Sequence, residues 1–301
     1  MTSFRPVKWW EIPALLMLFG FGVAACGDDT YQPRVICHNA NCQEPADPEN
    51  DSLMDSFERS MDLEVGDPEA PPFDGVEIDT FWWAESNRCL MAHDLDRPDD
   101  TVDAHEVIDH LNERLEQRID DELPITRYHD EFTVLIELKD DVSEHGDSHS
   151  AGERRLHAEC VVEMAQSAID AADANGYSVE IIYMSFAPGL LVEVAEVMDD
   201  QLDAGDHPVR LSALQGIRRP VSDRTLPLDE YPDDIGIDLV STHPQWLAPG
   251  DLDAYASRGW DLGFWSFNLT PDILDAIRRY EPDYVTTSQA PSLAGWLDTR
   301  N

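Results

Sequence analysis

The stretch Gly75-Val76-Glu77-Ile78-Asp79-Thr80 has the pattern of a short β-strand with two carboxylates at its carboxyl end. Seven further β-rich runs occur along the chain, and segments with helical periodicity separate them. The eight predicted strands are 34–38, 75–80, 132–139, 179–185, 209–214, 236–241, 261–267 and 283–287. Strands that alternate with helices in this number predict an α/β fold, the parallel (β/α)8 or TIM barrel. A doubly wound open sheet is the alternative, because the helical pattern between 214 and 236 is poor.

The predicted helices lie between these strands. They cover 52–63, 104–123, 152–174, 190–202, 252–258 and 271–280, with 292–297 after the last strand. One further run, 88–91, predicts an extra strand behind the second. The glycines do not form the pattern of a phosphate-cradling turn between a strand and a helix. The sequence therefore predicts a barrel whose chemistry does not depend on a glycine-rich nucleotide loop.

The composition is strongly acidic, since 62 Asp and Glu residues against 20 Lys and Arg residues give a formal net charge of −42. The hydrophobic fraction of 42% is nevertheless too high for a disordered acidic chain. Phosphate groups repel a surface this acidic, so the charge excludes proteins that bind a nucleic-acid backbone. It also excludes proteins that anionic lipid holds by charge alone. Lysine occurs only as Lys8 and Lys139.

The N-terminus has the pattern of a secretory signal. Arg5 and Lys8 precede an uncharged apolar run, 12–25, that is too short to span a bilayer. The run ends in Val23-Ala24-Ala25-Cys26-Gly27, which resembles a bacterial lipobox. We therefore expect a lipoprotein signal peptide over 1–25, a tether lipidated at Cys26 over 26–33, and the barrel domain over 34–301. An ordinary signal peptide with a coincidental cysteine is the alternative.

A lipid on Cys26 would attach the protein to the cell envelope, on the periplasmic side of the outer membrane or at the cell surface. The anchor would then be the only contact with the membrane. Export would also permit disulfides between the remaining cysteines. Their spacing leaves two bridges open, Cys37–Cys42 and Cys42–Cys89, and does not match a zinc site.

Reactive side chains gather where the first three predicted strands and the extra strand end. In a barrel, these ends and the loops after them surround one mouth. The set comprises His38, Asn39, Glu77, Asp79, His93, Glu137 and Lys139. Three inward carboxylates require a cation, and their oxygen atoms suit Ca²⁺ or Mg²⁺ better than Zn²⁺. Two histidines beside them suit a general acid and a general base.

The order of these motifs resembles that of the glycerophosphodiester phosphodiesterases, a family of the phospholipase-C-like phosphodiesterase superfamily. Val35-Ile36-Cys37-His38-Asn39-Ala40 and then Pro48-Glu49-Asn50 resemble the family's His-Arg-Gly and Pro-Glu-Asn-Thr. Residues 74–79, 91–94 and 135–139 resemble its Gly-Val-Glu-x-Asp, His-Asp and Ile-Glu-x-Lys. Residues 264–268 and 282–287 resemble its Trp-Thr-Val-Asn and Asp-Gly-Ile-Ile-Thr-Asp. The likeness covers nearly all of the chain after the signal segment.

The resemblance implies a metal-dependent phosphodiesterase acting on glycerophosphodiesters, which are phospholipid headgroup diesters. Glu77, Asp79 and Glu137 would bind a divalent metal, Ca²⁺ or Mg²⁺. His38 and His93 would be the catalytic acid and base. Lys139 would bind the substrate phosphate, where a cation stabilises the charge that gathers on the phosphoryl oxygens.

Two positions depart from the family pattern. Asn39 stands in place of the Arg after the first histidine, and Ser288 in place of the last Asp. The pair His38-Asn39 instead resembles the calcium-dependent phosphoinositide phospholipases C, in which the amide oxygen binds Ca²⁺. A phospholipase C-like enzyme with Asn39 as a fourth ligand is therefore one alternative function. A non-catalytic barrel lipoprotein that only binds its ligand is another.

Overall fold

The computed structural model describes residues 31–42, 54–63, 71–91, 102–139, 150–215, 235–247 and 250–300. Its strands are β1 (Arg34–Cys37), β2 (Gly75–Trp83), β3 (Arg88–Met91), β4 (Val102–Asp103), β5 (Glu131–Leu138), β6 (Ser178–Ser185), β7 (Val209–Gln215), β8 (Ile237–Thr242), β9 (Asp261–Trp265) and β10 (Tyr284–Thr287). Its helices are α1 (Met54–Met61), α2 (Ala104–Asp120), α3 (Ala151–Asn175), α4 (Pro188–Gln201), α5 (Asp251–Ser257), α6 (Pro271–Tyr280) and α7 (Ala290–Asp298). Short 3-10 turns lie at His38–Ala40 and Pro244–Trp246. None of the described helices is both long enough and apolar enough to cross a membrane.

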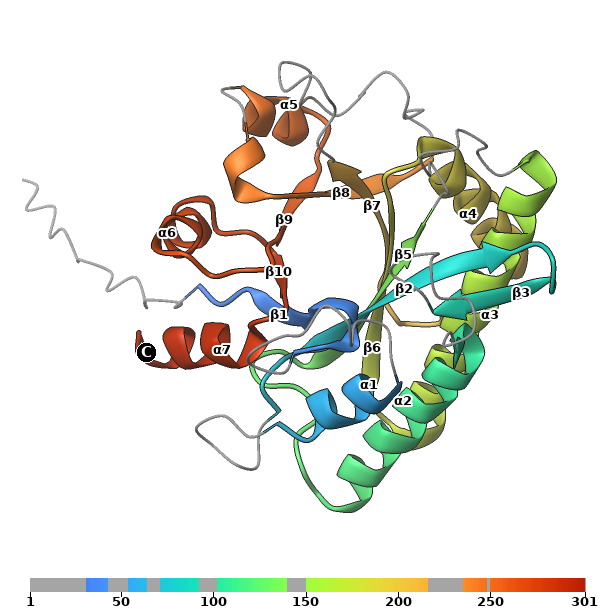
Figure 1. The fold of residues 1–301 in the computed structure, drawn as a ribbon, viewed down its shortest axis with the longest axis horizontal. Coiled ribbons are helices and arrows are strands. Elements are labelled where there is room, and N and C mark those ends of the chain that lie inside the picture. The colour runs from blue at the N-terminus through green and yellow to red at the C-terminus, as the bar shows by residue number, and fades with distance from the viewer. Residues whose placement is uncertain are drawn as a thin grey trace, which may run out of the picture. The chain divides into compact units, whose positions relative to one another are not determined.

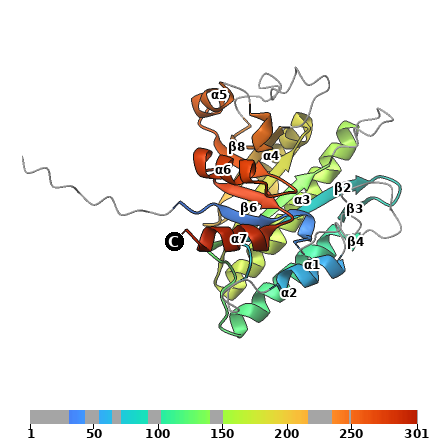
Figure 2. The same ribbon diagram turned by 60° about the vertical axis from the view of Figure 1, so that its left-hand side comes forward.

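Parallel strands close into a barrel. β1 pairs with β10 on one side and with β2 on the other, and the sheet continues through β5, β6, β7, β8 and β9 to β10. Figures 1 and 2 show the helices on the outside of this ring, with α2 and α3 on one flank and α6 and α7 on another. The predicted (β/α)8 barrel is confirmed, with eight parallel strands in the described part of the chain, and the open-sheet alternative is wrong.

The predicted extra strand is confirmed as β3. It pairs antiparallel with the end of β2, from Thr80↔Met91 to Trp83↔Arg88, and so lengthens β2 beyond its predicted end at 80. A two-residue strand, β4, adds to β3 and was not predicted, because two residues carry no periodic signal. The segment 216–234, where the helical pattern is poor, lies outside the described residues.

Glycine allows the barrel interior to pack closely at two places. A Cβ on Gly263 would lie 2.3 Å from the ring of Tyr284, which occupies that space on the neighbouring strand. A Cβ on Gly75 would lie 2.2 Å from the carbonyl oxygen of Thr133. Tyr284 belongs to one buried apolar cluster with residues from five other strands: Ile36, Leu135, Ile182, Met184, Leu214 and Leu239. The interior is therefore a packed core and not a channel.

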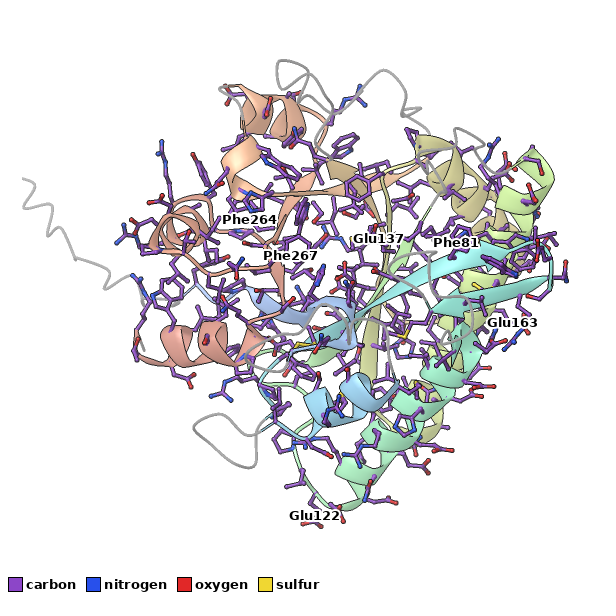
Figure 3. All side chains as sticks on the ribbon, in the orientation of Figure 1. Phe81, Glu122, Glu137, Glu163, Phe264 and Phe267 are labelled. Carbon is purple, nitrogen blue, oxygen red and sulfur yellow. A yellow bond between two sulfur atoms is a disulfide. The ribbon has the colours of Figure 1, made fainter. Side chains whose placement is uncertain are left out.

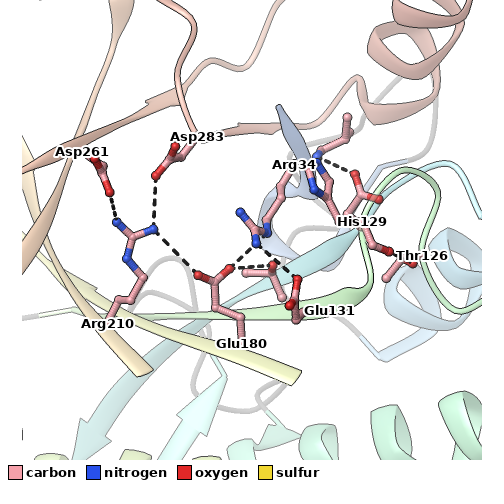
Figure 4. Close-up of polar contacts among 11 residues, drawn as sticks. Arg34, Thr126, His129, Glu131, Glu180, Arg210, Asp261 and Asp283 are labelled. Carbon is pink, nitrogen blue, oxygen red and sulfur yellow. Dashed lines mark hydrogen bonds and ion pairs between the residues drawn. The ribbon is translucent and has the colours of Figure 1, made fainter. Parts of the chain in front are cut away.

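An ion-pair network closes the amino-terminal end of the barrel (Figure 4). Glu180 of β6 is 3% exposed and lies between two arginines, 3.2 Å from Nε of Arg34 and 3.8 Å from Nη1 of Arg210. Arg34 also contacts Glu131, and Arg210 also contacts Asp261 and Asp283. Because catalysis in such barrels occurs at the opposite end, we assign this network to stability.

Of the two bridges that the spacing left open, the structure contains Cys37–Cys42, so the Cys42–Cys89 alternative is wrong. Cys89 and Cys160 are free and buried. The bridge closes a short loop directly after β1, and this loop carries the first site residues.

Candidate active site

The turn after β1 holds His38 and Asn39 in a constrained backbone. Asn39 and Ala40 both have left-handed φ values, 49° and 53°, which residues other than glycine seldom adopt. The Cys37–Cys42 disulfide closes the turn, and the amide of Asn41 donates to the carbonyl of His38 at 2.9 Å. Strained backbone of this kind persists only where its surroundings hold it, and it is common at functional sites.

His38 is buried at the carboxyl end of β1. Its Nδ1 lies 3.3 Å from Oγ of Ser288, the residue in place of the family's last Asp. Its Nε2 lies 3.6 Å from Oε2 of Glu77, and the ring of Phe267 meets its own ring edge-on at 4.8 Å between centroids. Because Ser288 holds Nδ1, Nε2 is the nitrogen that faces the carboxylates.

Three carboxylates converge beside His38. Glu77 and Asp79 share one face of β2, and Glu137 pairs with Asp79 across to β5. One oxygen from each lies within 4.8 Å of the others, and all three side chains are buried. Among the described residues, this is the one group of three or more Asp, Glu, His or Cys side chains that could hold a metal ion.

The electrostatics of the cluster favour a cation. Burial, followed by the charges of Asp79 and Glu137, raises the pKa of Glu77 well above its ordinary value. Lys139 offsets part of this charge, with Nζ 2.8 Å from Oε1 of Glu137 and 3.3 Å from Oδ2 of Asp79. Burial alone would lower the pKa of Lys139, but the neighbouring carboxylates outweigh it and raise the pKa. Lys139 is therefore a permanent ammonium at this site.

Asn39 completes the polar side of the mouth. Its backbone N–H donates to Oε2 of Glu77 at 3.2 Å. Its side-chain amide lies against Asp79, where the nitrogen can donate to Oδ2 at 2.6 Å and to Oδ1 at 3.2 Å. The opposite amide orientation directs an oxygen at the same carboxylate, which is favourable only with a cation between them. The donor set, carboxylate oxygens with one amide oxygen in reach, fits a hard divalent cation.

Four rings line the other side of the mouth, and we call them the aromatic wall: His243, Trp246, Trp265 and Phe267. Neighbouring ring centroids lie 5.1 Å apart for His243 and Trp246, 4.7 Å for Trp246 and Trp265, and 5.9 Å for Trp265 and Phe267. Burial lowers the pKa of His243. The indole Nε1 of Trp265 is buried and has no hydrogen-bond partner among the described residues. The wall thus presents apolar faces and, at Trp265, a buried N–H donor.

Figure 3 shows how the two sides relate. Glu137 and Phe267 both lie toward the centre of the barrel, whereas Glu122 and Glu163 lie at the helical periphery. Phe267 is 47% exposed, although its ring contacts the buried His38. The mouth therefore has a charged side from β1, β2 and β5, and an apolar side from β8 and β9.

The structure brings most of the predicted site residues together: His38, Asn39, Glu77, Asp79, Glu137 and Lys139. His93 and Cys26 lie outside the described residues, as do Pro48, Glu49 and Asn50. Sequence reasoning missed His243 and Trp246 of the aromatic wall. His243 directly follows β8, so its place at a strand end was the signal that could have identified it.

The sequence matches no protein-family model and no curated protein. Solved structures do resemble it. A glycerophosphodiester phosphodiesterase from Parabacteroides distasonis aligns with a TM-score of 0.54 and 17% identity over 89% of this chain and 98% of its own. A glycerophosphodiester phosphodiesterase from Agrobacterium tumefaciens aligns with a TM-score of 0.52 and 12% identity, over 87% of this chain and 99% of its own. The chain has the same barrel fold as these two enzymes.

Proposed function

We propose that the protein is a metal-dependent phosphodiesterase that hydrolyses glycerophosphodiesters by general acid and base catalysis at two histidines. One observation carries the proposal: Glu77, Asp79 and Glu137 converge within 4.8 Å at the carboxyl ends of barrel strands. Buried carboxylates at this spacing are costly without a cation, and strand ends are where such barrels perform their chemistry. The shared fold and the order of the motifs support the same assignment.

Four side chains would hold the metal: Glu77, Asp79, Glu137 and Asn39 through its amide oxygen. When bound, a divalent cation supplies positive charge for the phosphoryl oxygens and acts as a Lewis acid. Lys139 stands beside the same carboxylates and would contact a phosphoryl oxygen through Nζ. Its ammonium would stabilise the negative charge that develops there in the transition state.

The histidines would move the protons. Nε2 of His38 faces the carboxylate cluster, while Ser288 fixes the ring through Nδ1. A ring held in this way can take a proton from the attacking hydroxyl or donate one to the leaving alkoxide. His93 is the partner for the opposite step, on the strength of the motif that it shares with the family. The aromatic wall would cover the alcohol groups of the diester and exclude water from the reacting atoms.

Turnover of bis-(p-nitrophenyl) phosphate and of a panel of glycerophosphodiesters tests this function, with Ca²⁺ and Mg²⁺ supplied separately. We expect metal-dependent hydrolysis by the wild type and no hydrolysis by Glu77→Gln, which removes one ligand charge and keeps the side-chain size. Asp275→Asn is the matched control, because that carboxylate is 70% exposed on α6 and should leave the rate unchanged. Full activity of Glu77→Gln would overturn the site.

The position of Asn39 favours a second candidate, a calcium-dependent phosphoinositide phospholipase C-like enzyme. Its side-chain amide lies against Asp79, and the orientation that turns the amide oxygen toward that carboxylate would let the two share a cation. Such an enzyme would cleave phosphoinositides with Ca²⁺ and would not accept Mg²⁺. The substrate and metal panel above separates the two candidates.

The location of the enzyme is a further part of the proposal. We propose attachment to the cell envelope through a lipid on Cys26, on the strength of the lipobox-like sequence before it. Glycerophosphodiesters released from membrane lipids would then meet the barrel outside the cytoplasm.

A further inference from the structure

Two free thiols meet where β3 packs against α3. Cys89 lies in β3 and Cys160 in α3, and both are buried, with 3% and 7% exposure. The Cys89 thiol interacts with the Cys160 thiol, and both residues line one cavity. The two residues are far apart in sequence, so tertiary packing alone brings them together.

A cavity of about 270 Å³ opens onto this pair. Both cysteines line it, together with Trp82, His105, Leu156 and Glu163. Leu156 is 38% exposed, so the cavity communicates with the surface. The cavity therefore gives a small disulfide a route toward the two cysteines.

We propose that Cys89 and Cys160 form a second disulfide in the mature protein and that this bridge joins β3 to α3. The reaction is thiol–disulfide exchange with an external protein or small-molecule disulfide. One cysteine, as a thiolate, attacks that disulfide, forms a mixed disulfide and releases one external thiol. The second cysteine then attacks the mixed disulfide, forms the Cys89–Cys160 bond and releases the second external thiol. Two thiols lose two protons and two electrons, and the external disulfide accepts them.

Two observations favour a disulfide between Cys89 and Cys160 over two unreactive thiols in the core. The chain already contains the Cys37–Cys42 disulfide, and the export that its N-terminal sequence predicts would permit a second one. The two side chains also interact, line one cavity and come from elements that pack together, which brings the two thiols close to each other in the folded chain. Burial, with Cys160 beside it, raises the pKa of Cys89, which lowers its thiolate fraction, so we expect both air oxidation and exchange at Cys89 to be slow.

Each of the two bridges, the observed one and the proposed one, includes a cysteine that lies shortly before a predicted catalytic histidine. Cys37 directly precedes His38, and Cys89 lies four residues before His93 (93 − 89 = 4). If the proposed function holds, each disulfide fixes the strand that leads to one catalytic histidine. The bridge itself does not depend on that function, and its test reads the bond directly.

The full chain is equilibrated with a glutathione redox pair, alkylated under denaturing conditions without reduction, and digested for mass spectrometry. We expect a peptide pair linked through Cys89 and Cys160, beside the Cys37–Cys42 link. In Cys160→Ser, we expect Cys89 to be alkylated and the Cys37–Cys42 link to remain. Alkylation of both Cys89 and Cys160 in the oxidised wild type would overturn the proposal, and so would a bond from Cys89 to another cysteine.

Thermal unfolding of the wild type provides a second measurement that needs no variant to fold. The bridge would close a loop of 71 residues (160 − 89 = 71), so the oxidised chain should melt roughly 10 °C above the chain in which only this bond is reduced. If mass spectrometry shows the Cys89–Cys160 bond but the oxidised and reduced chains melt at the same temperature, the proposed stabilising link between β3 and α3 is overturned. Neither measurement depends on phosphodiester turnover. Both therefore still test the disulfide if the protein proves inactive in the phosphodiesterase assay.

Discussion

The ammonium nitrogen of Lys139 lies 2.8 Å from Oε1 of Glu137, two residues earlier on the same face of the barrel wall. It is also 3.3 Å from Oδ2 of Asp79 on the neighbouring strand. Lys139 is one of two lysines in the whole sequence. The barrel therefore carries its own cation at the place where its carboxylates repel one another. In the proposed function, a divalent metal would take some of these oxygens from the ammonium, and Lys139 would then contact the substrate phosphate.

The raised pKa of Glu77 predicts how stability depends on pH in the metal-free protein. A carboxyl group whose pKa is higher in the folded than in the unfolded state stabilises the fold at low pH, and this contribution is lost as pH rises through the raised value. With EDTA present, the free energy of unfolding should therefore fall as pH rises above the ordinary pKa of glutamate, about 4.3. Glu77→Gln should remove much of this fall and be more stable than the wild type above that pH. Urea unfolding at pH 5 and at pH 8 measures this, and identical pH dependence in the two proteins would contradict it.

Asn39 separates the two candidate functions. If its amide oxygen is a ligand, Asn39→Ala should weaken Ca²⁺ binding markedly, and Asn39→Arg should weaken it further by placing a cation beside the metal. If Asn39 only fills the place of the family's arginine, Asn39→Arg should keep metal affinity and lower KM through a charge-assisted contact worth roughly 1.5–3 kcal/mol, less if water reaches it. Calorimetric titration of Ca²⁺ and Mg²⁺, with KM at saturating metal, decides between them.

The backbone at Asn39 requires its own control. Because φ is 49°, Ala at this position adds strain that has nothing to do with the metal. Asn39→Gly tolerates that φ and also lacks the oxygen ligand. Equal metal affinity in Asn39→Gly and the wild type would rule out Asn39 as a ligand.

Glu180 should contribute to stability and not to catalysis. Glu180→Gln removes the charge between Arg34 and Arg210 and should lower the free energy of unfolding by roughly 3 kcal/mol, because buried charges lose their partner. Glu131→Gln is the matched control: that side chain is 32% exposed, and its loss should cost less than about 1 kcal/mol. Denaturant unfolding ranks the two variants. A large fall in kcat for Glu180→Gln, with unchanged stability, would contradict the assignment.

The aromatic wall should affect substrate binding more than chemistry. Trp246→Ala removes apolar contact area without touching the carboxylates, so KM for a glycerophosphodiester should rise about tenfold while kcat changes little. Trp296→Ala is the control, because Trp296 is similarly half-buried but lies on α7, where its ring contacts Arg300. A fall in kcat at constant KM would instead place Trp246 in the chemical step.

Cys26 should be required for lipid attachment. Cys26→Ser removes the sulfur that would carry the lipid, so unprocessed precursor should accumulate and no product should incorporate labelled fatty acid. Metabolic labelling and N-terminal sequencing of the wild type and the variant provide the measurement. Normal labelling of Cys26→Ser, or a mature wild-type N-terminus at another residue, would refute the lipobox interpretation.

Local patterns were enough to locate the strands and helices of the barrel. The predicted strand 179–185 became β6 (Ser178–Ser185), and the predicted helix 271–280 became α6 with the same bounds. These elements could be predicted because the alternation or helical periodicity of apolar residues follows from which face of each element is buried. The two-residue β4 and the extension of β2 to Trp83 were not readable, since their pairing partners lie elsewhere in the chain.

The candidate site likewise has residues that the sequence identified and contacts that only the structure shows. Glu77, Asp79, Glu137 and Lys139 were identifiable from sequence, because i, i+2 spacing at a strand end fixes the side of the strand that they share. The sequence alone therefore determined the barrel and the charged side of its mouth. Contacts between distant segments needed the tertiary structure: Ser288 on His38, Trp246 on Trp265, and Cys89 on Cys160. Nothing in local periodicity encodes which strand end or helix face meets another, because the closure of the barrel sets those distances.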